Sequence, residues 1–271
     1  MKLPSNLKRI LSFALALIML VGMMPVHAHA AESDQPIDAA VIFSDLHAMY
    51  NGDSSTGDKG YKQTKITNMM TALKNTGLPF SSVHSGGDAF SSNSTQNTNY
   101  TDTVTGYIQS VLGNIPVGYV WSDHDRGALD NSSSKKKLDK TSHLAYGAGN
   151  DGVYGTADDG NYYVYYLSMG DLCSYDRYKA GFNYTQSNNS GRVSAGFTPT
   201  VAQAIANFRA DAAKLDKSKP LFIVSHQPLF DNRNDNAWAE DWFDAINAVA
   251  EKMDVAFFYG HNHKYDNASD Y

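Results

Sequence analysis

The sequence predicts an α/β fold in which strands and helices alternate along one chain. Five short apolar runs each end in a cluster of acidic or histidine residues, and segments with helical spacing of apolar residues lie between several of them. Such alternation is typical of layered α/β domains. Because loops that follow strand ends usually hold the functional groups of these folds, we expect the polar clusters to lie at one edge of a sheet.

The expected strands share a short apolar core and an abrupt change to polar residues. They cover 39–45, 82–88, 116–121, 220–225 and 254–259. The clusters at their ends read Ser-Asp-Leu-His, Ser-Gly-Gly-Asp, Ser-Asp-His-Asp, His-Gln-Pro and Gly-His-Asn-His. The run 220–225 is the clearest of the five, since its apolar residues are those of a buried strand.

Three helices are expected between these strands. Thr198 followed by proline predicts a capped helix start, and apolar residues then repeat with helical spacing over 201–215. A second apolar stripe runs from Trp238 to Met253, and its tryptophans are expected in the core rather than stacked on a cofactor. The segment 61–73, rich in Thr and Lys, predicts a third helix.

Two segments are expected to be irregular. The first, 91–101, is rich in Asn, Ser and Thr. The second, 126–160, contains a Gly-rich part with two acidic turns, 150–152 and 158–160. These turns are interpreted either as calcium sites built from oxygen ligands or as solvated acidic turns, and the absence of EF-hand spacing favours the second interpretation.

The first 30 residues are typical of a secretory signal peptide. Lys2, Lys8 and Arg9 precede an uncharged apolar run at 10–24, and Ala28-His29-Ala30 has the pattern of a cleavage site. A membrane anchor is the alternative, but a spanning helix needs about 20 apolar residues. We therefore expect a secreted domain, 31–271, without a membrane anchor in the mature chain.

The charge balance argues against a nucleic-acid partner. Cleavage removes three positive charges and no negative ones, which takes the net charge from −6 to −9. Nucleic-acid binding relies on basic residues that neutralise phosphates, so a nuclease is a weak alternative. The single cysteine, Cys173, cannot form an intrachain disulfide and is expected to be a buried apolar thiol.

Histidines gather at the ends of the expected strands. Of the nine in the chain, His27 and His29 leave with the signal peptide, and His84 and His143 lie outside the clusters. The remaining five are His47, His124, His226, His261 and His263. Imidazole and carboxylate ligands together suit zinc, iron and manganese, so the clusters predict a transition-metal site.

In this order, the clusters resemble the motifs of the calcineurin-like metallophosphoesterase family. The matching segments are Asp45-Leu46-His47, Gly87-Asp88, Asp123-His124-Asp125, His226 and Gly260-His261-Asn262-His263. The resemblance extends from about residue 39 to the end of the chain. It implies an αββα sandwich of two mixed β-sheets flanked by helices, with a dinuclear metal site at the strand ends.

The resemblance also implies a role for each residue. One ion would be held by Asp45, His47, Asp88 and His263, and the other by Asp88, Asp123, His226 and His261, with Asp88 bridging. The ions would be two divalent or transition metals (Mn, Fe or Zn). Two cations about 3.5–4 Å apart can share a hydroxide and clamp phosphoryl oxygens during in-line displacement.

The resemblance implies that His124 takes the family's general-acid role, in which it would protonate the leaving oxygen, while Asp125 is expected to support neighbouring groups. Alternatives remain for these residues. In these alternatives His124 contacts the substrate or a metal ligand. The histidines His47, His261 and His263 cap loops by hydrogen bonding, and Asp45 and Asp88 are turn or helix-cap carboxylates.

The chain departs from the family pattern at three places. Asp123 stands where the family usually has asparagine, and an ionised carboxylate accepts hydrogen bonds but does not donate one to a phosphate oxygen. Ser91 stands where the purple acid phosphatases have a ligand tyrosine, so no tyrosinate–iron chromophore is expected. The sequence stops at Tyr271, soon after His263, so we expect the domain to be incomplete at its C-terminus.

The resulting functional expectation is a secreted hydrolase of phosphate mono- or diesters. Its partner would be a small phosphate ester or an extracellular phosphoester. The alternative is a metal-binding surface protein with a weakened or inactive phosphoesterase site, and this alternative is motivated by the extra negative charge of Asp123.

Overall fold

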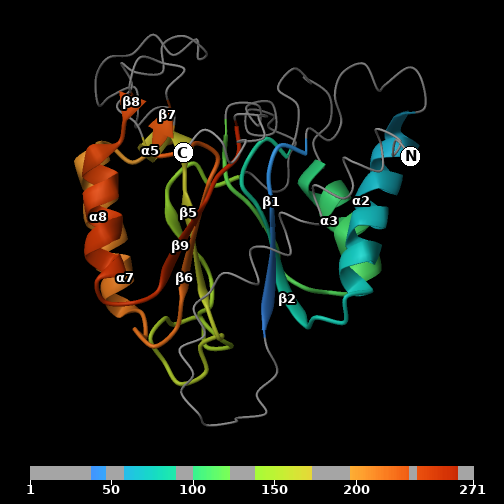
Figure 1. Ribbon diagram of the computed structural model, residues 1–271, viewed down its shortest axis with the longest axis horizontal. Coiled ribbons are helices and arrows are strands. Elements are labelled where there is room, and N and C mark those ends of the chain that lie inside the picture. The colour runs from blue at the N-terminus through green and yellow to red at the C-terminus, as the bar shows by residue number, and fades with distance from the viewer. Residues whose placement is uncertain are drawn as a thin grey trace, which may run out of the picture. The chain divides into compact units, whose positions relative to one another are not determined.

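The computed structural model describes residues 38–46, 58–89, 100–122, 138–172, 196–231 and 237–261 (Figure 1). The chain divides into two units between Pro36 and Ile37, and every described residue belongs to the second unit. The expected signal peptide therefore lies outside the described residues. Within the described ranges, no helix combines the length and the apolar character that a membrane span requires.

The first sheet has three parallel strands in the order β1-β2-β3. These strands are β1 (Ala39–Phe43), β2 (Phe80–Ser85) and β3 (Val117–Tyr119). The helix α2 (Asp58–Lys74) connects β1 to β2, and α3 (Tyr100–Leu112) precedes β3. Because the strands are parallel, their carboxyl ends meet at a single edge of this sheet.

The second sheet has four strands in the order β4-β5-β6-β9, and β4 runs antiparallel to the others. Its strands are β4 (His143–Tyr146), β5 (Tyr163–Leu167), β6 (Leu221–Ser225) and β9 (Val255–Phe258). The short helix α5 (Met169–Leu172) follows β5, while α7 (Val201–Lys214) and α8 (Glu240–Ala250) precede β6 and β9. A small antiparallel pair consists of β7 (Phe230–Asp231) and β8 (Ala237–Trp238).

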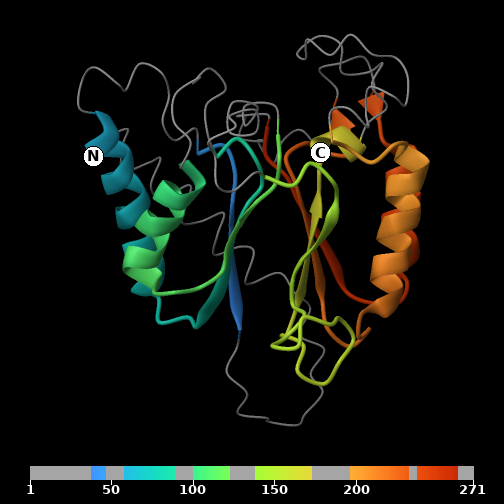
Figure 2. The same cartoon turned by 180° about the vertical axis from the view of Figure 1, so that it is seen from behind.

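Alternation along β5 shows how the layers pack. Tyr163 and Tyr165 lie in the apolar core beneath α7 and α8, whereas Val164 and Tyr166 pack in the core that includes Ile42 of β1. Successive strand residues point to opposite faces, so the second sheet is covered on both sides. The helices α2 and α3 lie beyond the first sheet (Figures 1 and 2).

The described residues therefore form the four layers of the expected αββα sandwich. The expectation of two mixed sheets holds for the second sheet only, since the three described strands of the first are all parallel. All five expected strands are confirmed in position, as β1, β2, β3, β6 and β9.

The start of α7 differs from its prediction by two residues. The N-cap is Thr200, whose hydroxyl accepts a hydrogen bond from the backbone N–H of Gln203 at 3.0 Å. Thr198, the predicted cap, instead donates its hydroxyl to the carboxylate of buried Asp171 at 2.8 Å. The cap was mispredicted because a buried acceptor elsewhere in the fold binds the first threonine.

The apolar stripe from Trp238 to Met253 is not one helix. Trp238 belongs to β8, where it pairs with Phe230, and α8 begins only at Glu240. Trp242 is buried and donates its ring N–H to the backbone oxygen of Asp171 at 2.9 Å, which confirms its core position. The apolar spacing therefore predicted the helix correctly from Glu240 onward but wrongly included Trp238.

Six of the described elements were not predicted, namely α3, β4, β5, α5, β7 and β8. The strand β4 lies inside the segment 126–160 that was expected to be irregular, and β5 lies in a tyrosine-rich stretch. The helix α3 overlaps the end of the loop expected at 91–101 and buries Val104 and Ile108. The helix expected at 61–73 is present as α2.

The Gly-rich segment after β4 forms turns held by their own carboxylates. Asp158 accepts hydrogen bonds from the backbone N–H groups of Asn150 and Asp151 at 2.9 and 3.2 Å, and from the hydroxyl of Thr156 at 2.7 Å. These contacts agree with an acidic turn and leave the calcium interpretation without structural support among the described residues.

A buried polar cluster links the two sheets at His84. Its Nε2 lies 2.7 Å from the hydroxyl of Ser82, and its Nδ1 lies 2.6 Å from the hydroxyl of Tyr166 on β5. The ring is 2% exposed, and burial lowers the pKa of His84 to about 3. His84 is therefore neutral in the folded protein at ordinary pH.

We predict that His84 makes the protein less stable as the pH falls from about 6.5 to about 3. In that window the unfolded chain binds a proton that the folded chain excludes, which corresponds to about 1.4 kcal/mol per pH unit for one group. His84→Gln should reduce this pH dependence of the free energy of unfolding, measured by urea denaturation at several pH values. The control is His143→Gln, a change at a half-buried ring beside Tyr166, and equal pH slopes for wild type and His84→Gln would contradict the prediction.

Candidate metal centre

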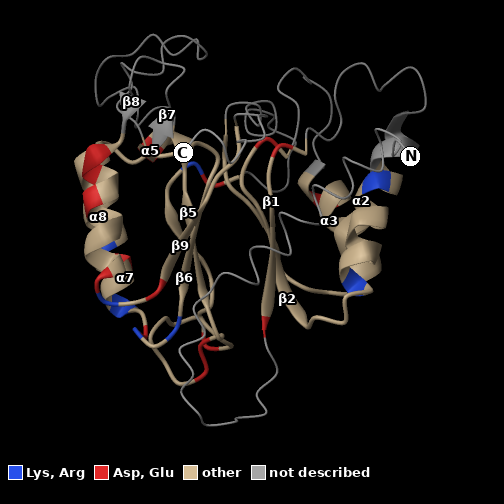
Figure 3. Cartoon of the chain, viewed as in Figure 1, with Lys and Arg blue, Asp and Glu red and all other residues tan. Residues whose placement is uncertain are grey.

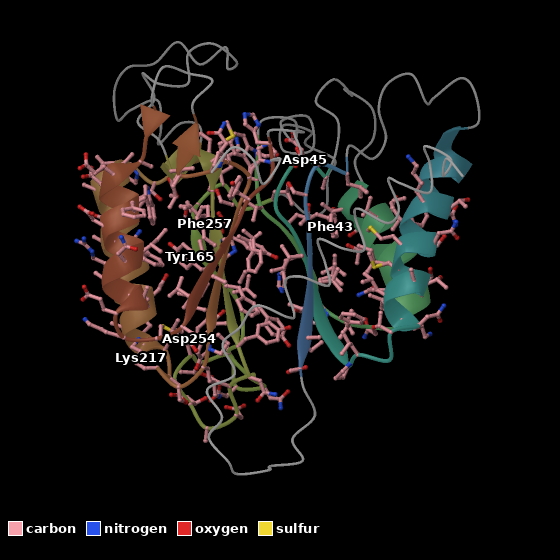
Figure 4. The ribbon with its side chains drawn as sticks, in the orientation of Figure 1. Phe43, Asp45, Tyr165, Lys217, Asp254 and Phe257 are labelled. Carbon is pink, nitrogen blue, oxygen red and sulfur yellow. The ribbon has the colours of Figure 1, made fainter. Side chains whose placement is uncertain are left out.

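Four predicted ligands follow strands whose carboxyl ends meet where the two sheets face each other. Asp45 follows β1 and Asp88 follows β2, while His226 and His261 follow β6 and β9. Figure 4 shows Asp45 beyond Phe43 at the upper end of β1, and Figure 3 shows acidic residues at the same edge of the first sheet. The parallel course of these strand pairs brings distant parts of the sequence to this place.

Three of these side chains form one compact group. Asp88, His226 and His261 each offer a ligand atom, and these atoms lie within 4.8 Å of one another. The Nε2 atom of His226 lies 3.3 Å from the Oδ2 atom of Asp88 and 3.0 Å from the Nδ1 atom of His261. Asp88 and His226 are buried, and His261 is partly buried. The group can therefore hold a metal ion.

The proton of His226 lies on the side of the ring that faces away from the group. Its Nδ1 atom is 3.1 Å from the backbone oxygen of Gly86, and a carbonyl oxygen only accepts hydrogen bonds. In the neutral ring, the lone pair of Nε2 is then directed into the group formed with Asp88 and His261. One carboxylate with two imidazoles suits zinc, iron or manganese.

Backbone strain concentrates at the same place. Among the residues that the structure describes, the only ones other than glycine with positive φ are Asp45 (57°), Asp88 (47°) and His261 (75°). The left-handed region is disfavoured for side chains with a Cβ atom, and such strain gathers at functional sites. All three residues are predicted ligands, which agrees with a site that requires their unusual orientation.

Two glycines permit the close approach of the strand ends. A Cβ atom on Gly87 would lie 2.7 Å from the Cβ atom of His226, and one on Gly260 would overlap the side chains of Asp45 and Ser44. Gly87 also has a φ of 92°, which glycine adopts readily. The glycine of the Gly-Asp motif and that of the Gly-His motif are thus needed for packing.

Asp45 contacts the group through the backbone of His261. The N–H of His261 donates to the carboxylate of Asp45, with distances of 3.0 Å to Oδ2 and 3.2 Å to Oδ1. The N–H of Asp45 in turn donates to the backbone oxygen of Gly87 at 3.1 Å. Asp45 therefore lies beside the group of three and fixes the position of His261.

Ser122 is a site residue that sequence reasoning missed. Its hydroxyl accepts a hydrogen bond from the N–H of Asp88 at 2.7 Å and donates one to the Oδ1 atom of Asp88 at 2.5 Å. Oδ1 is engaged in this way, while Oδ2 faces His226. The available signal was its position, because Ser122 directly precedes the predicted ligand Asp123.

Several predicted site residues lie outside the described residues. They are the ligands His47, Asp123 and His263, the general acid His124, and Asp125. Cys173 and Ser91 also lie outside. Of the seven predicted ligands, the structure therefore brings three together and places a fourth, Asp45, beside them.

Comparisons with known proteins leave the family unassigned. No family model matches the chain, and no curated protein matches it. Among solved structures, the chain is similar to a phosphopantetheinyl hydrolase from Mycobacterium tuberculosis, with 12% sequence identity and a TM-score of 0.40. The similarity covers 84% of this chain and 86% of the other. A likeness at this level does not bear on function, so a functional assignment rests on the geometry of the site.

We predict that Ser122→Ala weakens metal binding by about 10- to 100-fold, the usual effect of removing a group that orients a ligand. The carboxylate of Asp88 would lose the hydrogen bond that fixes its orientation. Isothermal titration with Zn²⁺ or Mn²⁺ measures the change. The matched control is Ser168→Ala, which removes a buried hydroxyl that has no hydrogen-bond partner, and equal affinities in both variants would contradict the role of Ser122.

Proposed function

We propose that the protein is a secreted, metal-dependent phosphoesterase of the calcineurin-like kind. The observation that carries this proposal is the group formed by Asp88, His226 and His261. These residues were predicted as ligands from three separate motifs, and they meet with ligand atoms within 4.8 Å. A chance assembly of three predicted ligands from opposite sheets is a poor explanation for this arrangement.

The proposed centre holds two ions. His226 and His261, together with Asp123, would bind one ion, while Asp45, His47 and His263 would bind the other, and Asp88 would bridge them. The position of Asp45 beside His261 supports its inclusion. Such a pair of ions supplies Lewis acidity toward phosphoryl oxygens and activates water as a nucleophile.

The remaining roles fall to side chains of this chain. His124 would donate a proton to the leaving oxygen, and the residues of the centre would orient a phosphate ester supplied as a small molecule or as an extracellular phosphoester. Export would follow from the signal-like segment 1–30. The net charge, −6 for the full chain and −9 without this segment, disfavours a nucleic-acid substrate.

Assays on the purified protein test the proposal directly. Hydrolysis of aryl phosphate monoesters and diesters should depend on added Mn²⁺ or Zn²⁺ and should be lost on chelation. Tight metal binding without turnover of either ester class would instead favour a metal-binding surface protein, the alternative that the charge of Asp123 motivates.

We predict that the protein holds close to two transition-metal ions per chain and that Asp88→Ala removes most of both. A bridging carboxylate serves both ions, so its loss should affect the two together. Elemental analysis after dialysis measures the content, with Asp139→Ala as a control because this carboxylate is more than half exposed. A protein that neither contains nor takes up metal would refute the proposed centre.

We predict that Asp123→Asn raises activity on monoesters about tenfold relative to diesters. A monoester dianion carries more negative charge than a diester, and two like charges about 4 Å apart repel by about 4 kcal/mol at an effective dielectric of 20. The cations offset much of this repulsion, so about 1.4 kcal/mol, or one decade in rate, is expected to remain. The measurement is kcat/KM for a matched ester pair in both proteins at one pH, and a fall in monoester activity would show that Asp123 is needed as a carboxylate ligand.

A further inference from the structure

Gln227 is buried between two predicted ligands and is only partly hydrogen bonded. It follows His226 directly, is 1% exposed, and places its amide nitrogen 3.3 Å from the Nε2 atom of His261. Its amide oxygen Oε1 has no hydrogen-bond partner. Buried polar atoms are nearly always hydrogen bonded, so this oxygen calls for an explanation.

The hydrogen bonds around His261 form a directed chain. The amide N–H of Gln227 donates to Nε2 of His261, which leaves the ring proton on Nδ1. That Nδ1–H donates to Nε2 of His226 at 3.0 Å, and the Nδ1–H of His226 donates to the oxygen of Gly86 at 3.1 Å. In this chain each ring nitrogen that donates faces an acceptor, and each one that accepts faces a donor. The proton of His261, however, lies on Nδ1, the nitrogen that faces the proposed metal centre.

Metal binding requires the opposite arrangement in His261. The nitrogen nearest the centre is Nδ1, and a ligating nitrogen must offer its lone pair. The neutral ring then carries its proton on Nε2, the atom that faces Gln227. A ligating histidine usually donates this second N–H to an acceptor, and an amide nitrogen cannot accept.

We propose that Gln227 is a positioning residue whose side-chain amide turns over when the proposed metal centre is loaded. A half-turn about the terminal torsion, which is soft in glutamine, brings Oε1 to Nε2 of His261. The ring loses the proton on Nδ1 and gains one on Nε2, so its net charge does not change. The unpartnered oxygen of Gln227 thus becomes the acceptor of the Nε2–H of His261. This inference rests on the proposed function, because it takes His261 as a ligand.

Two substitutions separate this role from simple packing. Gln227→Glu keeps an oxygen acceptor and loses the donor, whereas Gln227→Met keeps the length of the side chain and loses both. Gln227→Glu should therefore favour the Nε2–H form of His261 before any metal is added, and it should bind Zn²⁺ at least as tightly as wild type. Gln227→Met should bind Zn²⁺ about 10- to 100-fold more weakly.

Long-range ¹H–¹⁵N NMR of the metal-free protein reads the ring tautomer, with the His261 signal assigned from its loss in His261→Gln. We expect the Nδ1–H form in metal-free wild type and the Nε2–H form after zinc is added. Titration calorimetry gives the affinities, and Gln203→Met, on the surface of α7, is the control for loss of a glutamine amide. If Gln227→Met fails to fold, the test is the His261 tautomer in Gln227→Glu, which should be the Nε2–H form before any metal is added.

Two results would overturn the role of Gln227 while the metal centre stands. These are zinc binding by Gln227→Met at wild-type affinity, and an Nε2–H tautomer in the metal-free wild type. Failure of the wild-type protein to bind zinc or manganese would overturn the proposed function together with this inference.

Discussion

The contact between His226 and the Gly86-Gly87-Asp88 turn is the constraint on which the site depends. His226 follows β6 of the second sheet, and its Nδ1–H donates to the backbone oxygen of Gly86, which follows β2 of the first sheet. Gly87 has no Cβ atom to block this approach, and Asp88 must then adopt a left-handed backbone to direct its carboxylate at the ring. This contact therefore joins the two sheets at the site and brings two predicted ligands, Asp88 and His226, face to face.

This arrangement costs stability that the rest of the domain must offset. Left-handed backbone at a residue with a side chain costs on the order of 1–3 kcal/mol, and Asp45, Asp88 and His261 all adopt it. Domains are commonly stable by only about 5–15 kcal/mol in total. The aromatic core beneath α7 and α8, with Tyr165 and Phe208 in edge-to-face contact, provides buried apolar surface on the other side of the second sheet. The strained residues follow the carboxyl ends of β1, β2 and β9, whereas this core lies beneath α7 and α8, so the two occupy different parts of the domain.

Sequence patterns predicted the parts of this structure that depend on local order. Strand ends such as that before His226 are visible because apolar runs stop abruptly, and the αββα layers followed from the resemblance. The features that the patterns missed depend on tertiary contacts. Thr198 has the sequence pattern of a helix cap, but its hydroxyl donates to Asp171 instead. The position of Ser122 before Asp123 does not reveal its hydrogen bond to Asp88, which lies 34 residues earlier in the sequence. Local spacing cannot report a partner that only the fold brings near.

Burial alone does not make a histidine a ligand, as His84 and His226 show. Both rings are at most 2% exposed. The neighbours of His84 are the hydroxyls of Ser82 and Tyr166, and a hydroxyl can either donate or accept. The neutral ring of His84 is therefore satisfied without any ion. The Nε2 atom of His226 instead lies 3.3 Å from the carboxylate of Asp88 and 3.0 Å from the Nδ1 atom of His261, so three groups that can bind a metal ion meet at this ring. The partners at each ring, rather than its depth, distinguish a structural histidine from a candidate metal ligand.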